Sequence, residues 1–269
     1  MTTRTARALR FIVSAIAALL VVAAVARCNG SAPTPDAATG TVLITGSNRG
    51  IGLALAREYA GRGWTVIATA RRPGEAAELQ ALAAASPNVR IEQLDVTSDA
   101  DIAALRAALG DLPIDVLLNN AGSNAGGRGQ KFGELDYAVL DELVHVNVAA
   151  PLKLAETFLP NVLASRQKKI VVLSSIQASI TKTAGGSYFY RASKVALNMV
   201  MRTLARERED EGLIIGILSP GFVATDMTRG ADAPLTPEQS AHALALVVDG
   251  LTPAQSGDFI EYDGKSLPW

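Results

Sequence analysis

The feature that most constrains the fold is a regular alternation of short apolar segments and helical segments, which begins at Thr41. The apolar segments are rich in β-branched residues throughout, which is typical of strands buried on both faces of a sheet. They read TVLITG, WTVIATA, NVRIEQLDV, IDVLLNNAG, KKIVVLSS, LIIGILSP and DFIEYDG. Helical spacing lies between them, at 50–61, 75–85, 99–109, 134–165, 190–211 and 237–250.

Such alternation predicts an α/β fold whose parallel sheet is covered by helices on both faces. Right-handed connections between successive parallel strands then give a Rossmann-like, doubly wound arrangement. We expect about seven strands in a single domain over residues 41–269, because neither an internal repeat nor a second pattern interrupts the alternation.

The composition argues against several other classes of protein. The chain has 25 basic and 26 acidic residues, which are interspersed, so no basic patch for nucleic acid is expected. A single cysteine, Cys28, excludes an intramolecular disulfide. The two histidines, His145 and His242, lie far apart without ligand-like neighbours, and we therefore expect no metal site.

Residues 1–40 differ from the rest of the chain. A short basic region precedes an uncharged apolar run at 11–26, and a turn-rich linker follows it. This order resembles a secretory signal with a cut after Ala26, whereas inclusion of the two preceding apolar residues gives a marginal membrane anchor over 8–26. Arg27 stands where a lipoprotein signal needs a small residue, so lipidation of Cys28 is not expected.

A glycine-rich turn follows the first predicted strand and precedes the first predicted helix. Its glycines, Gly46, Gly50 and Gly52, have the spacing G-x3-G-x-G. Glycines at such a turn let the backbone approach a diphosphate, whose charge then meets the helix N-terminus. The turn is therefore a candidate dinucleotide-binding site.

The end of the second predicted strand indicates which dinucleotide would bind. A domain that binds NAD usually places an acidic residue there to accept hydrogen bonds from the ribose. This strand ends instead in Ala70, Arg71 and Arg72, and Arg49 lies within the glycine turn. Arginines suit a 2′-phosphate, so the sequence favours NADP over NAD.

Two tyrosines lie near a lysine in the segment YFYRASK, and helical geometry distinguishes them. If this segment is helical, Tyr190 and Lys194 stand at i and i+4 on one face, whereas Tyr188 has Ala192 at that position. A lysine ammonium close to a phenol lowers the pKa of the phenol. The pairing therefore selects Tyr190, with its pKa lowered by Lys194, as the tyrosine that could exchange a proton, although a Tyr-x3-Lys pair by itself does not indicate an enzyme.

These motifs occur in one order along the chain, together with NNAG at 119–122, VVLSS at 171–175 and SPGFVATDM at 219–227. The set resembles the short-chain dehydrogenase/reductase family, in its short single-domain branch, over essentially all of residues 41–269. The ending GDFIEYDGKSLPW also resembles the carbonyl-reductase-like subgroup that includes the sniffer and C-factor proteins.

The resemblance implies roles for individual residues. Tyr190 would be the acid/base, Lys194 its partner, Ser175 the group that orients the substrate carbonyl, and Asn147 the residue whose backbone holds a water. The implied cofactor contacts are Gly46, Ser47, Asn48, Arg49, Gly50, Ile51, Gly52, Arg71, Asp95, Val96, Asn119, Ala121, Gly122, Tyr190, Lys194, Pro220, Gly221, Val223 and Thr225. Ser174 remains an alternative to Ser175, because the gap to Tyr190 is longer than is common in the family.

The resemblance implies an NADP(H)-dependent oxidoreductase that passes a hydride between the nicotinamide and a carbonyl or alcohol substrate. The alternative is a dinucleotide-binding sensor or signalling protein with little turnover. The family also implies a homo-oligomer. For localisation, the N-terminal arginines place the domain outside the membrane, whereas cofactor supply favours a cytoplasmic catalytic domain. A translation start assigned upstream of the true one is a third explanation of residues 1–40.

Overall fold

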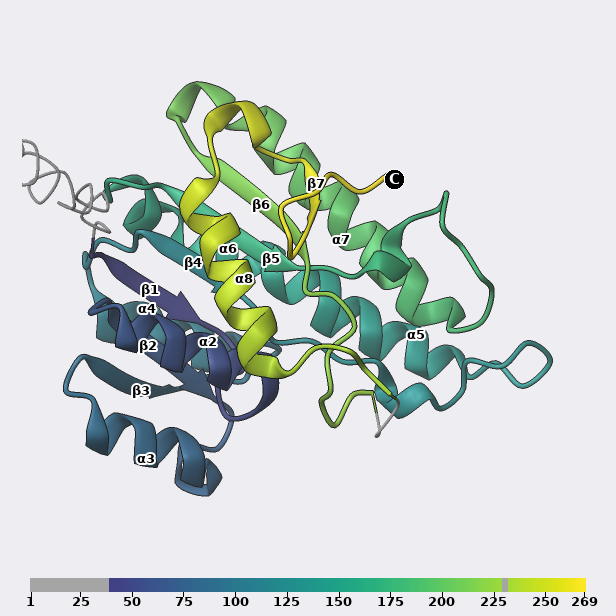
Figure 1. Ribbon diagram of the computed structural model, residues 1–269, viewed down its shortest axis with the longest axis horizontal. Helices are drawn as coiled ribbons and strands as arrows, with labels where there is room; N and C mark the ends of the chain where they lie inside the picture. Colours follow the sequence, from purple (N-terminus) through teal and green to yellow (C-terminus); the bar gives the residue numbers. More distant parts are fainter. Residues whose placement is uncertain (1–38, 229–231) are drawn as a thin grey trace, which may run out of the picture. The chain divides into compact units, whose positions relative to one another are not determined.

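A parallel sheet of seven strands forms the centre of the part of the chain that the computed structural model describes, residues 39–228 and 232–269 (Figure 1). The strand order is β3-β2-β1-β4-β5-β6-β7, and every neighbouring pair is parallel. The strands are β1 Thr41–Ile44, β2 Thr65–Ala70, β3 Val89–Gln93, β4 Val116–Asn119, β5 Lys169–Leu173, β6 Ile214–Ser219 and β7 Phe259–Glu261. Successive strands are added on one side of β1 up to β3 and on its other side from β4 onward. Ligands bind at such a switch point between β1 and β4 in open α/β sheets.

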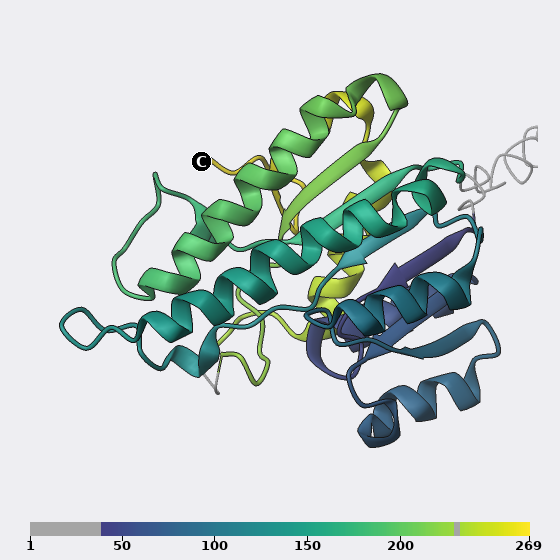
Figure 2. The same ribbon diagram turned by 180° about the vertical axis from the view of Figure 1, so that it is seen from behind.

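Helices cover both faces of the sheet, because alternate residues of each strand point to opposite sides (Figures 1 and 2). In β1, Val42 and Ile44 enter one apolar core, whereas Leu43 enters the other. The first core is closed by α2 Gly50–Gly61, α3 Ala77–Ala85 and α8 Pro237–Gly250. The second is closed by α4 Asp99–Leu109, α6 Ala150–Leu163 and α7 Tyr188–Glu207. The predicted fold class is confirmed.

All seven predicted strands are present, and the helices predicted at 50–61, 99–109 and 237–250 have the predicted bounds. The helix predicted at 75–85 begins at Ala77, because a 3₁₀ turn at Pro73–Glu75 precedes it. The prediction of one continuous helix over 134–165 is wrong. In its place are α5 Tyr137–Val144, a π-helical turn at His145–Ala149 and α6.

Proline explains why the helix is interrupted at this point. Pro151 has no N–H with which to donate to the carbonyl of Asn147, so the regular α-helical hydrogen bond cannot form there. The N–H of Ala150 instead donates to the carbonyl of His145, five residues earlier. Single π turns of this kind occur frequently at functional sites.

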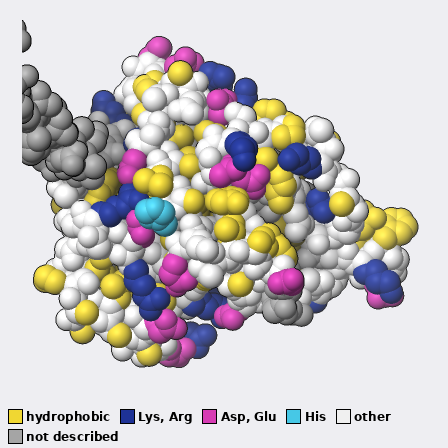
Figure 3. All heavy atoms as spheres, in the orientation of Figure 1, with side chains coloured by type: hydrophobic (Ala, Val, Ile, Leu, Met, Phe, Trp, Pro, Cys, Tyr) yellow, Lys and Arg dark blue, Asp and Glu magenta, His cyan; other side chains and the backbone are white. Residues whose placement is uncertain are grey.

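Ion pairs connect α2 to the helices on either side of it. Arg57 pairs with Glu78 of α3 at 2.9 Å, and Arg62 pairs with Asp249 of α8 at 2.7 Å. His242 lies 3.0 Å from Glu58. Figure 3 shows acidic and basic side chains interspersed on the face that it presents. These exposed or partly exposed contacts are individually weak, but together they favour one position of the helix that begins at the glycine turn.

The predicted signal or anchor segment, with Cys28 and the run at 8–26, lies outside the described residues. Residues Thr39–Trp269 form one structural unit. No helix in the described ranges has both the length and the apolar character needed to span a bilayer.

Candidate active site

The glycine turn between β1 and α2 has a backbone conformation that favours glycine at Gly46 and at Gly50. Gly46 has φ +68° and Gly50 has φ +55°, both in the left-handed region. A Cβ on Gly52 would lie 2.2 Å from the carbonyl oxygen of Gly46, which is far inside van der Waals contact. The N-cap of α2 is Arg49, whose side chain makes no capping hydrogen bond. The first-turn N–H groups of α2 therefore have the arrangement that binds anions at helix N-termini.

Asn120, in the NNAG segment that the family resemblance singled out, holds this turn against the neighbouring strand. Its Nδ2 donates to the carbonyls of Thr45, at 2.8 Å, and of Gly46, at 3.0 Å, and its backbone N–H donates to Thr45 Oγ1 at 3.0 Å. Its sequence signal was its place in the NNAG motif, directly after a buried strand. Asn119, expected to line the groove, is instead buried at 3 % exposure, with no hydrogen-bond partner for its amide among the described residues.

Other predicted contacts lie along the same edge of the sheet. A Cβ on Gly46 would approach Ala121 Cα to 3.1 Å, so the turn packs directly on the segment after β4. A Cβ on Gly122 would lie 3.2 Å from Asn147 Oδ1 and 3.6 Å from Lys194 Nζ. Gly122 therefore lies directly against Asn147 and Lys194, and a side chain at this position would crowd both.

Basic and acidic side chains meet beyond the ends of β2 and β3. Arg71 is exposed and contributes a positive potential at Asp95. Burial alone would raise the pKa of Asp95, but hydrogen bonds from Thr97 and the charge of Arg71 together hold that pKa below its usual value. Arg72 pairs with Glu75 at 3.0 Å. Arg71 is thus better placed than Arg72 to meet an anionic ligand near Asp95.

The loop after β6 folds over the glycine turn. Gly221 has φ +81°, and a Cβ there would lie 2.6 Å from Leu235 Cδ1. Thr225 Cγ2 would be 3.5 Å from a Cβ on Gly50, and Asp226 pairs with Arg49 at 2.8 Å. Arg49, one of the residues expected at the ribose, is therefore directed toward this loop.

The remaining predicted members of the turn and loop occupy the same region. Ser47 is buried, and its N–H donates to the carbonyl of Thr69 at 2.7 Å. Asn48 is exposed, whereas Ile51 and Val96 are partly buried. The carbonyl of Pro220 accepts from Ser240 at 2.7 Å, and Val223 is buried in a bridge to Leu235.

The two candidate serines at the end of β5 point in different directions. Ser174 is buried, and its hydroxyl donates to Asn198 Oδ1 of α7 at 2.5 Å. The Ser175 side chain interacts with the phenol of Tyr190. It also accepts from the N–H of Gln177 at 3.1 Å, which fixes its position at the strand end. The geometry thus favours Ser175, as strand alternation requires that only one of the pair face the site.

Tyr190 and Lys194 lie on one face of α7, as the i and i+4 spacing predicts. Lys194 Nζ is 5.8 Å from the centroid of the Tyr190 ring, and it donates to the carbonyl of Leu173 at 2.8 Å. Tyr188, which begins the helix, is 46 % exposed and packs near Phe132 at 5.9 Å between ring centroids.

The expected effect of Lys194 on Tyr190 is not met in this structure. Burial raises the pKa of Tyr190, and the contribution that opposes this rise comes from Ser175, not from Lys194. Burial also lowers the pKa of Lys194 to about 8. The physical reason is that both groups lie in a weakly polar environment, which disfavours each charged form. A phenol in this state is protonated at neutral pH and can donate a proton.

Asn147 lies in the π turn and connects it to the segment after β4. Its Oδ1 accepts from the N–H of Ser123 at 2.9 Å, and its Nδ2 donates to the carbonyl of Ser123 at 2.8 Å. A further bond joins Nδ2 to Ser193 Oγ of α7 at 3.0 Å. The side chain of Asn147 is therefore held on both sides, while Pro151, four residues on, has no N–H to donate to its backbone carbonyl.

The buried lysine predicts a measurable cost to stability. We expect Lys194→Met to leave the free energy of unfolding at pH 7 unchanged or to raise it by up to about 3 kcal/mol. Burial lowers the pKa of Lys194 from 10.5 to about 8, which means that keeping the ammonium charged in the folded protein costs free energy, and methionine removes this cost. The unfolded state binds more protons than the folded state between pH 8 and 10.5, so the native protein gains stability as pH rises through this window. The advantage of the variant over the native protein should therefore shrink from pH 8 to 10. Urea denaturation at several pH values measures this, and a large loss of stability at pH 7 would contradict it.

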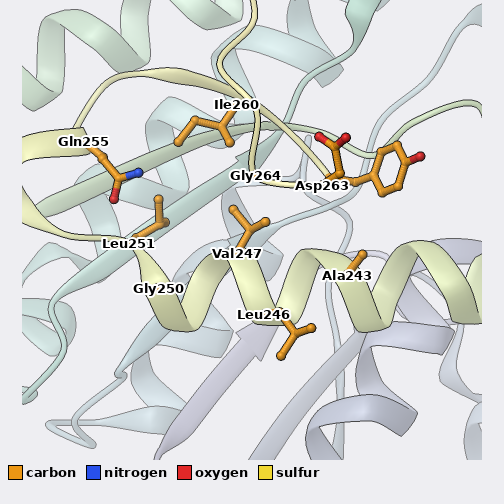
Figure 4. Close-up of a pocket in the computed structure, with 10 residues that line it drawn as sticks. Ala243, Leu246, Val247, Gly250, Leu251, Gln255, Ile260, Asp263 and Gly264 are labelled. Atoms are coloured by element: carbon orange, nitrogen blue, oxygen red, sulfur yellow. The ribbon is translucent and has the colours of Figure 1, made fainter.

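A separate hollow of about 340 Å³ lies between α8 and the segment around β7, where Val247 and Ile260 contribute to its wall (Figure 4). None of the predicted site residues lines it. The candidate active site is instead the region beyond the carboxyl ends of the strands described above.

Comparison with known proteins gives consistent matches. Residues 40–235 match the family model described as short chain dehydrogenase. The C-signal protein of Myxococcus xanthus is 37 % identical over 158 residues, which cover 58 % of this chain and 93 % of that protein. Among solved structures, the carbonyl reductase Sniffer of D. melanogaster has a TM-score of 0.77 and 30 % identity, covering 86 % of this chain and 100 % of that one. An NADPH-bound carbonyl reductase from chicken fatty liver has a TM-score of 0.80 and 32 % identity, covering 86 % and 99 %.

Proposed function

The chain belongs to the short-chain dehydrogenase/reductase family, and from this premise we propose that it is an NADPH-dependent reductase of carbonyl compounds with Tyr190 as its proton donor. The observation that carries the proposal is the placement of a partly buried, protonated phenol beside Ser175 and Lys194. Gly122 approaches Lys194, and the neighbouring Ala121 packs against the glycine turn at Gly46. The proton donor's partner and the glycine turn therefore contact the same segment after β4.

The residues present fit NADP(H), because the glycine turn has no room for a Cβ at Gly46 or Gly52 and its backbone is therefore bare where a diphosphate would approach. The glycine turn and the N-terminus of α2 would hold the diphosphate, and Arg71 the 2′-phosphate. Asp95 and Val96 would border the adenine, and the loop from Pro220 to Thr225 the nicotinamide. When bound, NADPH supplies the hydride. The NADPH-bound relative from chicken supports this choice of cofactor.

The chain's own residues would handle the proton. Tyr190 donates from its phenol to the carbonyl oxygen of the substrate, and the Ser175 hydroxyl donates a hydrogen bond to the same oxygen. The raised pKa of Tyr190 keeps the phenol protonated at neutral pH, which favours reduction over oxidation. Lys194 would return a proton to the phenolate, and the backbone carbonyl of Asn147 would hold the water that relays it. A protein that only bound the dinucleotide would have no need of this arrangement, which argues against the sensor alternative.

Cofactor choice supplies a direct test of the proposed function. In an assay of NADPH oxidation with aldehydes, ketones and quinones, kcat/KM should be higher with NADPH than with NADH. We expect Arg71→Asp to lower kcat/KM for NADPH by about 100-fold, because it removes a charge-assisted contact and adds repulsion to the phosphate. The value for NADH should change little.

The matched control for this substitution is Arg206→Asp. Arg206 is an exposed arginine at the end of α7 opposite to Tyr190, and it pairs with Glu209 at 3.7 Å. Arg206→Asp should preserve kcat/KM for both NADPH and NADH. It changes the net charge by the same amount as Arg71→Asp but lies away from the glycine turn. Equal use of NADH and NADPH by the native protein would contradict the assignment of Arg71.

We further propose that residues 1–40 are separate from the catalytic domain at 41–269 and act as a signal or an anchor. The basic and apolar composition of the segment supports this. Cell fractionation with N-terminal sequencing of the mature protein distinguishes a cleaved signal from a retained anchor and from a start codon assigned too early.

A further inference from the structure

The first turn of α7 carries Tyr190, and we propose that a distant glutamine, Gln130, is the positioning residue that fixes it. The inference rests on the proposed function, because it concerns how the proton donor is held. Gln130 does not reach the phenol: it acts on the backbone of Tyr190. The two residues are 60 positions apart in the chain and belong to different loops and helices.

Helix α7 begins without a cap of its own. Its N-cap residue, Ser187, has φ +50° and ψ +44°, and the Ser187 side chain makes no capping hydrogen bond. The preceding Gly185 and Gly186 are exposed and also have positive φ. The first N–H groups of a helix have no partner within the helix, so an uncapped start preceded by such a segment is expected to fray.

Gln130 supplies the missing cap from the loop between β4 and α5. Its Oε1 accepts from the backbone N–H of Tyr190 at 2.8 Å, and its Nε2 donates to the carbonyl of Asn124 at 3.0 Å. The side chain is only 5 % exposed, so both bonds are shielded from water. Loss of a buried partner costs more than loss of an exposed one, because the polar groups left behind have no solvent to bind.

The same contact connects Tyr190 to the loop after β6. Asn124, whose carbonyl accepts from Gln130, donates from Nδ2 to the carbonyl of Met227 at 3.2 Å. Its Oδ1 accepts from the N–H of Gly126 at 2.9 Å. Gln130 therefore joins three segments around the candidate active site: the loop after β4, the start of α7 and the loop after β6.

Loss of these bonds should displace the first turn of α7 without unfolding the protein. Phe189 packs into a small apolar cluster with Val139 and Leu143 of α5, and Tyr190 lies against it. This packing does not depend on Gln130, so the helix remains attached. Its first turn, however, would be free to shift, and a displacement of about 1 Å at a catalytic group is enough to reduce a rate about 100-fold.

The experiment compares Gln130→Met with Gln130→Glu and with a remote control. Methionine keeps the volume but loses both bonds, whereas glutamate keeps the acceptor for the Tyr190 N–H. We expect Gln130→Met to lower kcat for carbonyl reduction about 10-fold or more, with the Kd for NADPH within about 2-fold of the native value. Gln130→Glu, which loses the bond to Asn124 but keeps the acceptor for the Tyr190 N–H, should retain more of the native kcat than Gln130→Met. Gln255→Met, which removes a glutamine cap at the short helix Pro253–Gln255, should leave kcat unchanged.

Two further readouts separate positioning from general damage. Hydrogen exchange of the Tyr190 amide should accelerate in Gln130→Met but not in Gln255→Met, because the acceptor of that N–H is removed. In a Tyr190→Phe background, Gln130→Met should cause no further loss of kcat, since the residue acts through Tyr190. An unchanged exchange rate, or an equal loss of kcat in both backgrounds, overturns the inference. Failure of the proposed function is visible separately, as a native protein that reduces no carbonyl compound.

Discussion

Replacement of Tyr190 by phenylalanine should lower kcat for carbonyl reduction by about 1,000-fold or more and leave the Kd for NADPH within about 3-fold of its native value. The phenol oxygen is the group that would donate the proton, and general acid catalysis contributes roughly 100- to 10,000-fold. Phenylalanine keeps the ring, its packing beside Lys194 and the helix start. Stopped-flow measurement of NADPH oxidation, with fluorescence titration of NADPH binding, gives both numbers.

Tyr188→Phe is the matched control, because Tyr188 lies in the same helical turn but is largely exposed, and the residue four positions on is Ala192. We expect its kcat to stay within about 2-fold of the native value, as no catalytic contact is lost. Similar losses in the two variants would show that the ring packing at this helix start, and not the Tyr190 proton, controls the rate. Full activity in Tyr190→Phe would remove Tyr190 from the mechanism.

The pH dependence of the same assay follows from the direction of the pKa shift. Because burial raises the pKa of Tyr190, the protonated phenol persists above its usual titration range. The rate of reduction should therefore be flat through neutral pH and fall only in the alkaline range.

The sheet could be predicted from the sequence because its signal is local. Each strand is a short apolar run bounded by turn residues, and strands buried on both faces need no partner to be identified. The pairing of Tyr190 with Lys194 was likewise predictable, since it follows from helical spacing alone. Such features depend on residues within one element.

Features that depend on distant residues could not be read from the sequence. Asn120 holds the glycine turn across 75 positions, and Gln130 caps α7 across 60. Neither residue has a pattern in its own segment that predicts its partner. The direction of the Tyr190 pKa shift also needed the structure, because proximity to Lys194 was predictable but burial of both groups was not. The π turn was missed for a different reason: the apolar spacing continues on both sides of Pro151, and the predicted helix was extended through this proline although it cannot donate the regular hydrogen bond.

The glycine turn offers the second large effect, through Gly52→Ala. We expect this variant to lose about 3 kcal/mol of unfolding free energy and about 100-fold or more in NADPH affinity. The new Cβ would lie 2.2 Å from the Gly46 carbonyl oxygen and 2.4 Å from Asn120 Nδ2, so the turn must open. Opening it breaks the Asn120 bonds that hold the turn on β4 and moves the first N–H groups of α2 away from the diphosphate.

Gly61→Ala at the end of the same helix isolates this steric cause. No atom lies within 4 Å of a Cβ built there, and alanine is favoured over glycine in a helix by roughly 0.5–1 kcal/mol. We therefore expect Gly61→Ala to raise the melting temperature slightly and to bind NADPH with native affinity. Thermal denaturation and a binding titration on the two variants give the comparison. If both alanines weaken binding alike, helix α2 as a whole is responsible, and the close approach at Gly52 is not what makes the phosphate site.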